Sequence, residues 1–396
     1  MNSLRTAAGI VCAVIASSAM SLALAQDLPH HYLTDDQPDY NAPPNPAQFD
    51  QRPIGTPGQN SQDDFASSMC RSDWDNACAC GYVQVDALFL RREPQFTDQP
   101  IIVDANTNTT VLATSGLGFN FDPGLRATID WRLCNGRMVE LSYFGLFGGN
   151  ASATVISNPA DFLIFPGNLV GNVFVDFDRA FVNYSSGLHG LEANLLCCCG
   201  CCETCGCQEC GCNQSCNSAC WDSQCCRSFT WFAGFRYLNL NEQLDILVER
   251  DILGGVEDGS YRLSTSNQLF GGQLGARVRR TNGRFGWEGT AKAGIFGNSA
   301  QQEQTVTDFP NFPLRPTVSS STGGVAFLGE LNLTALYQLT NTWNLRAGYT
   351  AFWVEGVALA PDQLDFNFGL APSGDQINNS GGLFLHGFNV GVEARW

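Results

Sequence analysis

The last fifteen residues, 382–396, alternate between apolar and polar side chains with a period of two. In an extended chain successive side chains point to opposite faces. A strand over these residues therefore has one apolar face and one polar face that includes a charged pair. The apolar face carries Phe384, His386, Phe388, Val390, Val392, Ala394 and Trp396, and the polar face carries Gly387, Asn389, Gly391, Glu393 and Arg395.

Two kinds of sheet have such strands. A transmembrane barrel strand needs about ten residues, with an apolar lipid face, a polar lumen face and aromatic residues at the interfaces, whereas an edge strand of a soluble sheet needs only one apolar face. The segment also resembles the C-terminal insertion signal of bacterial outer-membrane proteins, which the barrel-assembly machinery binds. The residues that match this insertion signal are Asn389, Gly391, Ala394 and Trp396.

The N-terminal part of the chain predicts export and a long unfolded arm. Residues 1–25 contain Arg5, an apolar stretch and the ending Ala23-Leu24-Ala25, which is typical of a secretory signal peptide. Residues 26–69 are rich in Pro and Asp and poor in apolar residues, so we expect a disordered linker. Residues 70–80 form a cysteine-containing periplasmic segment, and residues 81–396 form the barrel domain. No later stretch is long enough for a membrane helix.

From residue 81 onward the period of two recurs in segments separated by turn signals, which predicts an all-β protein. Tight turns are expected at 134–136, 281–283 and 340–341. The alternating segments number about ten, with twelve as the alternative if Gln243 to Val248 and Tyr261 to Thr265 add two strands. The expected strands lie at about 83–89, 125–133, 139–147, 191–195, 229–237, 270–279, 287–295, 325–337, 343–353 and 382–396.

The charged residues inside these strands all fall on the polar face. In a membrane barrel this face lines the lumen, so we expect lumen-facing charges that pair across the interior. The seven acids and eight bases are Asp86, Asp130, Glu140, Glu192, Glu288, Glu330, Glu393, Arg126, Arg132, Arg236, Arg277, Arg279, Lys292, Arg346 and Arg395.

Connection lengths distinguish a membrane barrel from a soluble sandwich. Long connections, such as 148–186, 241–263 and 298–321, alternate with the tight turns. Outer-membrane barrels have short periplasmic turns and long external loops, and a sandwich gives no reason for this regularity. The sequence therefore predicts a single antiparallel transmembrane β-barrel.

Cysteines cluster in one segment, 197–227, which interrupts the regular pattern as a cysteine-rich insert. The barrel topology places it, with the other cysteines of the exported chain, in the periplasm, where disulfides are favoured. Thiolate metal binding is an alternative because some pairs are two residues apart, but the spacing is irregular and no His is nearby, so no metal is expected. Unpaired cysteines could join the barrel to the cell wall or to other chains. The disulfide candidates are Cys70, Cys78, Cys80, Cys134, Cys197, Cys198, Cys199, Cys201, Cys202, Cys205, Cys207, Cys210, Cys212, Cys216, Cys220, Cys225 and Cys226.

Several stretches together resemble the β-barrel porin type 7 family of bacterial outer-membrane proteins. They are Tyr82 to Arg91, Trp231 to Leu238, Ser266 to Ala276, Lys292 to Gly294, Leu345 to Tyr349, Val357 to Pro361 and His386 to Gly391. The resemblance covers about 81–396, apart from the cysteine-rich insert. It implies an outer-membrane barrel with a pore function and no catalytic residues.

Two functions remain open at this point. The family resemblance favours a narrow passive pore for ions or small solutes. A barrel of about ten strands has a lumen that side chains largely fill, which favours a structural or anchoring barrel with a closed lumen. The diameter of a barrel grows with its strand number, so the alternative of twelve strands favours the pore, and the pore is the preferred interpretation.

Other functions have little support in the sequence. A net charge of −17 disfavours nucleic acid as a partner. Catalysis is not expected because neither His189 nor His386 has a recognisable partner in the sequence, and no cofactor is expected.

Overall fold

The computed structural model describes residues 81–95, 97–132, 137–158, 162–167, 173–202, 226–310, 312–314, 316–367 and 374–395. The chain divides into two units, Met1–Arg71 and Ser72–Trp396, and all described residues lie in the second. The predicted signal peptide, the linker and Cys70, Cys78 and Cys80 lie outside the described part of the chain. Among the described residues, no helix has the length and hydrophobicity of a membrane span.

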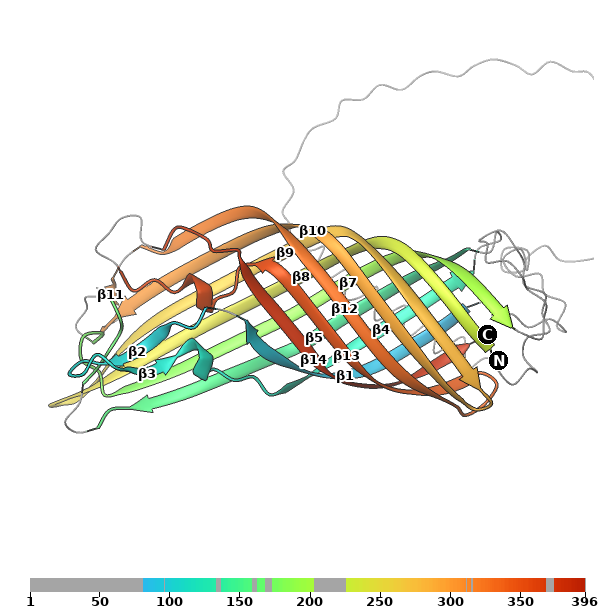
Figure 1. The fold of residues 1–396 in the computed structure, drawn as a ribbon. Helices are drawn as coiled ribbons and strands as arrows, with labels where there is room; N and C mark the ends of the chain where they lie inside the picture. The colour runs from blue at the N-terminus through green and yellow to red at the C-terminus, as the bar shows by residue number, and fades with distance from the viewer. Residues whose placement is uncertain are drawn as a thin grey trace, which may run out of the picture. The chain divides into compact units, whose positions relative to one another are not determined.

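Ten long antiparallel strands close into one barrel (Figure 1). Around the ring their order is β10, β12, β13, β14, β1, β4, β5, β7, β8 and β9, and β9 pairs again with β10. The all-β fold and the strand number of ten are therefore confirmed. The strands are β1 (Gly81–Gln95), β4 (Phe121–Arg132), β5 (Arg137–Ile156), β7 (Arg179–Cys202), β8 (Cys226–Ile252), β9 (Gly255–Asn282), β10 (Phe285–Asp308), β12 (Val318–Gln338), β13 (Trp343–Val357) and β14 (Gly381–Arg395).

The alternative of twelve strands is wrong. Gln243 to Val248 and Tyr261 to Thr265 belong to β8 and β9, which continue outward and pair with each other up to Ile252 and Gly255. The expected long loop at 241–263 is reduced to a tight turn, where Gly254 adopts a φ of 115°, a conformation that favours glycine. The expected loops at 148–186 and 298–321 are likewise partly strand, because β5, β7, β10 and β12 extend into them.

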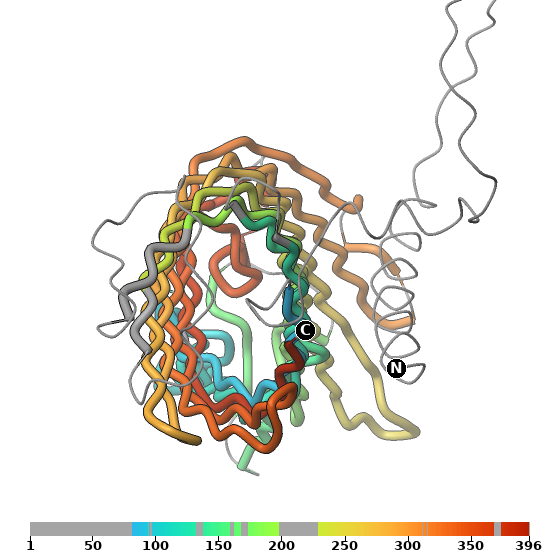
Figure 2. Tube along the Cα trace, turned by 90° about the vertical axis from the view of Figure 1, so that its right-hand side faces the viewer, coloured from blue at the N-terminus to red at the C-terminus, as the bar shows by residue number. Residues whose placement is uncertain are grey.

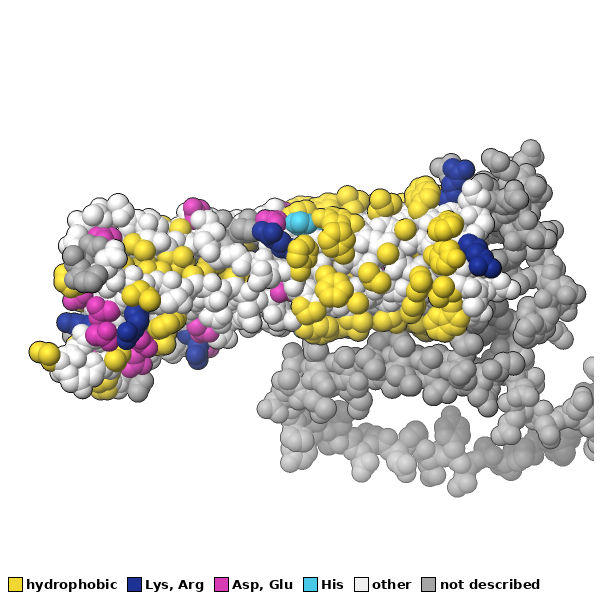
Figure 3. Space-filling model, turned by 90° about the horizontal axis from the view of Figure 1, so that it is seen from below, with side chains coloured by type: hydrophobic (Ala, Val, Ile, Leu, Met, Phe, Trp, Pro, Cys, Tyr) yellow, Lys and Arg dark blue, Asp and Glu magenta, His cyan; other side chains and the backbone are white. Residues whose placement is uncertain are grey.

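The apolar side of the strands changes face along the barrel. Near the end where β1 begins and β14 ends, large apolar side chains point outward, and Figure 3 shows them as a belt over one half of the barrel. Trp231, Phe270 and Trp343 are 45%, 63% and 37% exposed, so they do not fill a core between two sheets. Beyond the belt the apolar side chains point inward, as Leu244, Ile246 and Val248 do on β8.

The change of face matches a membrane span followed by an aqueous extension. β9 has 28 residues, whereas a transmembrane strand needs about ten, so more than half of this strand lies beyond the membrane. There the barrel encloses an apolar core that includes Phe165, Phe174, Tyr261 and Phe366. We call this part of the barrel the outer extension.

Connecting segments fill the outer extension. Three short strands form a separate small sheet. β2 (Pro100–Asp104) and β3 (Thr110–Ala113) follow β1 in the chain, and β6 (Leu163–Ile164) follows β5. The short helices η1 (Thr114–Gly116) and η2 (Pro361–Gln363) lie in the connections before β4 and before β14, and β11 (Phe312–Pro313) pairs with the end of β10. Viewed along the barrel, part of these connections lies inside the ring of strands (Figure 2).

The predicted cysteine-rich insert is described only at its edges. β7 continues through Cys202 and β8 begins at Cys226, and these two residues are cross-strand partners. The first cysteines of the segment, Cys197 to Cys202, are therefore part of the barrel wall. Residues 203–225 and Cys134 lie outside the described residues.

Candidate functional site: the barrel interior

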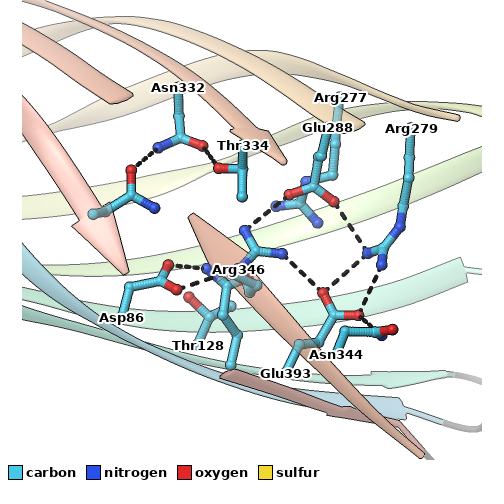
Figure 4. A network of polar contacts seen from close by, with 12 residues as sticks. Asp86, Thr128, Arg277, Arg279, Glu288, Asn332, Thr334, Asn344, Arg346 and Glu393 are labelled. Atoms are coloured by element: carbon cyan, nitrogen blue, oxygen red, sulfur yellow. Dashed lines mark hydrogen bonds and ion pairs between the residues drawn. The ribbon is translucent and has the colours of Figure 1, made fainter. Parts of the chain in front are cut away.

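Two arginines and three acids form a network at the end of the lumen where β14 finishes (Figure 4). Arg346 contacts Glu393 at 2.9 Å, Glu288 at 3.2 Å and Asp86 at 3.3 Å. Arg279 donates to both carboxylate oxygens of Glu393 at 3.0 Å each. β9, which carries Arg279, and β14, which carries Glu393, are separated in the ring by β10, β12 and β13. The Arg279–Glu393 pair therefore crosses the lumen, whereas the Arg346–Glu393 pair joins the neighbouring strands β13 and β14.

A second group lies on β1, β4, β5 and β9. Arg277 Nη2 donates to Glu140 Oε2 at 2.7 Å, and Arg277 Nη1 lies 2.7 Å from the hydroxyl of Tyr82. That hydroxyl donates to Glu140 at 2.6 Å, and the backbone N–H of Tyr82 donates to Asp130 at 2.8 Å. The acids Glu140 and Asp130 are each only 1% exposed, and charge pairing or hydrogen bonding compensates for their burial.

The next layer outward centres on Arg236, whose side chain is fully buried. Its Nη1 lies 2.9 Å from Glu330 and 3.2 Å from Glu192. Arg126 contacts Glu330 at 2.5 Å, and Lys292 contacts Glu192 at 2.8 Å. Arg126 and Glu330 come from β4 and β12, which are separated in the ring by β1, β14 and β13. This layer also spans the lumen.

An apolar layer follows directly. Phe144 of β5 and Phe352 of β13 stack with ring centroids 5.5 Å apart, although β4, β1 and β14 separate their strands in the ring. Arg236 lies 5.0 Å from the ring of Phe352 and Arg126 lies 5.6 Å from the ring of Phe144. We call these buried side chains the lumen plug: Leu88, Leu90, Phe144, Leu146, Leu188, Leu238, Leu240, Leu269, Phe296, Ala326, Leu328, Phe352, Val354, Val357, Leu359, Leu383 and Leu385.

A buried ion pair lies beyond the lumen plug. Arg92 pairs with Glu242, and both side chains are almost fully buried. Glu242 Oε2 also accepts hydrogen bonds from the hydroxyl of Tyr184 at 2.8 Å and from the backbone N–H of Ala360 at 2.9 Å. The carboxylate of Glu242 thus holds the connection between β13 and β14 against the inner wall of the barrel.

Amide side chains hold the same connection at other points. Asn267 donates to the carbonyl of Ala358 at 2.8 Å, and Gln302 donates to the carbonyl of Gly374 at 2.8 Å. Asp362 accepts a hydrogen bond from the backbone N–H of Thr97 at 2.8 Å, and partial burial raises the pKa of its carboxyl group. The described parts of this connection, residues 358–367 and 374–380, are therefore held to the inner wall of the barrel.

The expected lumen charges lie in the barrel interior. Every one whose side chain is described takes part in the networks above or, like Arg395 beside Glu393, contacts them. The side chain of Arg132 and the terminal Trp396 of the expected insertion signal lie outside the described part of the chain. Asn389 is buried in the lumen, and a side chain at Gly391 would clash with Asp86. No three metal-ligating side chains gather within the described ranges.

The sequence did not reveal the partners of the two histidines. The hydroxyl of Tyr143 lies 3.0 Å from His189 Nδ1, and the hydroxyl of Tyr349 lies 2.5 Å from His386 Nδ1. His386 Nε2 also lies 3.3 Å from Glu93. Each histidine thus has a partner that could not be recognised in the sequence. All these groups lie on the outward face of the barrel.

Comparison with known protein families identifies the chain. The family described as Putative beta barrel porin-7 (BBP7) matches residues 151–396, which is more than half of the sequence. The chain belongs to this family. The resemblance to the BBP7 family is confirmed, and the protein is a porin-like barrel of the outer membrane. No curated protein sequence is significantly similar to this BBP7 member.

Solved outer-membrane barrels are similar to this BBP7 chain at low sequence identity. They include the outer membrane protease OmpT from Escherichia coli, at 10% identity and a TM-score of 0.38, with 80% of this chain and 96% of OmpT covered. A FadL homologue from Pseudomonas aeruginosa has 8% identity and a TM-score of 0.23, with 80% and 90% covered. An anion-selective porin from Comamonas acidovorans has 9% identity and a TM-score of 0.13, with 81% and 99% covered.

Proposed function

We propose that this BBP7 barrel is a structural element of the outer membrane whose lumen is closed. The observation that carries the proposal is the contact of Phe144 with Phe352 across the lumen, within a layer of buried apolar side chains. An ion crossing this layer would lose its hydration without gaining a polar partner, which is costly. The cross-lumen ion pairs below the plug and the folded connection above it add further barriers.

The strand number supports the same function. Barrels of about eight strands are filled by side chains, whereas open porins have sixteen or more. Twelve strands would favour a pore, but Gln243 to Val248 and Tyr261 to Thr265 extend β8 and β9 and add no strand to the ring.

We expect the purified full-length barrel to give no conductance steps in planar lipid bilayers. Insertion is verified by the resistance of the barrel to protease, and an open porin in the same bilayers serves as the positive control. Reproducible steps from the inserted protein would overturn the closed lumen. They would instead support the second candidate, a narrow passive pore for ions or small solutes, which membership in the BBP7 family favours.

An anchoring role is the second part of the proposal. The cysteines of residues 197–227, together with Cys70, Cys78, Cys80 and Cys134, would lie in the periplasm, where thiols form disulfides. Bonds to other chains would tether the barrel to a cell-wall layer or to other envelope proteins.

Reducing agent tests the anchor. We expect the protein in envelope extracts to run as large species that convert to monomer when reductant is added. Migration as monomer before reduction would contradict the tether, and it would leave the closed lumen unaffected because the bilayer experiment measures that independently.

A further inference from the structure

A charged cluster interrupts the apolar outward face where the hydrophobic belt ends. Arg91 and Glu93 of β1 point outward, and Arg91 lies opposite His386 of β14 in the strand register. One carboxylate oxygen, Glu93 Oε1, lies 3.3 Å from Arg91 Nε and 3.3 Å from His386 Nε2. The hydroxyl of Tyr349 on β13 contacts the other ring nitrogen of His386 at 2.5 Å. Three neighbouring strands thus build one chain of polar contacts on the outside of the barrel: an ion pair between Arg91 and Glu93, and hydrogen bonds between Glu93 and His386 and between His386 and Tyr349.

The cluster lies at the depth where lipid hydrocarbon gives way to headgroups. Phe89 precedes Arg91 on the same face and is 46% exposed, and Phe384 and Phe388 flank His386. Figure 3 shows a histidine beside basic and acidic side chains at the border of the hydrophobic belt. Interfacial aromatic residues mark this depth in membrane barrels.

Glu93 holds the Nε edge of the Arg91 guanidinium, and the edge formed by Nη1 and Nη2 is available to a ligand. Glu93 is the only described partner of Arg91, and it faces Nε. Nη1 and Nη2 have no partner among the described residues, and the side chain is 49% exposed. The planar fork of arginine matches the oxygens of a phosphate group, to which it can donate two parallel hydrogen bonds.

We propose that Arg91 binds the headgroup phosphate of a lipid in the outer leaflet, and that Glu93, His386 and Tyr349 position its guanidinium. In this arrangement the hydroxyl of Tyr349 donates to His386 Nδ1, and His386 Nε2–H donates to Glu93. Both ring nitrogens are thereby used to orient the carboxylate, which in turn orients Arg91. The exposed rings of Phe89 and Phe388 and the half-buried ring of Phe384 supply apolar contacts for the acyl chains.

An arginine at a membrane border can also extend its charge into water without binding a particular lipid. That role requires neither a fixed guanidinium nor a carboxylate held by a His–Tyr pair, and it predicts no selectivity for phosphate. The two roles are therefore distinguished by comparing lipids that differ only in the phosphate.

The test uses the full-length barrel in a neutral detergent and two probes, a short-chain phosphatidic acid and the diacylglycerol with the same chains. We expect binding of the phosphatidic acid alone, measured by native mass spectrometry. Arg91→Gln should weaken this binding by about tenfold or more, since it removes charge-assisted hydrogen bonds. Arg91→Lys should retain part of it, because lysine keeps the charge but lacks the fork.

Arg262→Gln is the matched control. Arg262 also lies on the outward face and contacts a carboxylate, Asp245, at 2.7 Å, but it belongs to the outer extension. Its replacement should leave lipid binding unchanged. Equal binding of the diacylglycerol, or unchanged binding by Arg91→Gln, would overturn the proposal.

Inorganic phosphate is the remaining arm, because a free ion carries the same chemistry. At the same concentration as the phosphatidic acid it should fail to displace the lipid, since it lacks the acyl chains that contact the aromatic rings. Full displacement would overturn the assignment to a lipid. None of these outcomes depends on whether the lumen conducts.

Discussion

Replacing Arg236 by Met should lower the free energy of unfolding of the barrel by about 3–5 kcal/mol, the usual cost of removing one partner from a buried ion pair. Arg236 is the fully buried cation that lies between Glu192 and Glu330. Without it, Lys292 and Arg126 alone would compensate two buried carboxylates. Urea titration of the barrel folded into lipid vesicles, followed by tryptophan fluorescence, measures the change.

Two further variants separate the ion pair from the loss of side-chain packing. Arg262→Met removes an exposed arginine, with 68% of its side chain accessible, and should cost less than about 1 kcal/mol. Arg236→Lys should recover part of the loss relative to Arg236→Met, because it restores a cation near Glu192 and Glu330. An Arg236→Lys variant that is no more stable than Arg236→Met would show that packing of Arg236 on Phe352, rather than charge, dominates.

The interior charges could be placed from the sequence because a membrane strand has a simple rule. A charge on the lipid face is costly near the middle of the membrane, so the apolar residues of each segment fix its phase, and the charges on the alternate positions point inward. Arg236 and Glu330 were assigned in this way from Phe235, Tyr237, Leu331 and Leu333. The ion pairs between them could not be predicted, because alternation fixes the face of each strand but does not fix its register or the partners across the lumen.

The outer extension and the lumen plug were missed for a related reason. On β8 the alternation reverses between Tyr237 and Leu238. Up to Tyr237 the apolar side chains point outward, and from Leu238 onward they point inward. A search for a single phase ends the strand there and leaves a loop. A reversed alternation was nevertheless present, with Leu244, Ile246 and Val248 separated by Asp245 and Leu247. The reversed phase of these residues is the sequence signal for the extension of β8.

The cluster around His386 illustrates the limit of reading one strand at a time. Glu93 and Tyr349 lie far from His386 in the sequence, on β1 and β13. They meet because β14 pairs with both of these strands, which joins the first and last strands of the barrel. Closure of the ring is a property of the whole chain, so no local pattern could have brought these three residues together.

The second large effect is expected on the lipid face. Leu331→Arg should destabilise the folded barrel by about 2–4 kcal/mol, because an arginine at the bilayer midplane loses its hydration. The outward residues of the belt on β12 run from Val325 to Tyr337, and Leu331 lies midway and is 49% exposed. The same urea titration in vesicles measures the loss.

Ser321→Arg is the matched control, because Ser321 is on the same face of the same strand but beyond the belt. A charge there meets water or headgroups and should cost no more than about 1 kcal/mol. Both variants introduce arginine into the same strand, so its strand propensity cancels. The difference between their free energies of unfolding then reports which part of β12 lies in the membrane. Equal costs would mean that lipid does not contact Leu331. The change of apolar face along the strands would then need an explanation other than the edge of a membrane.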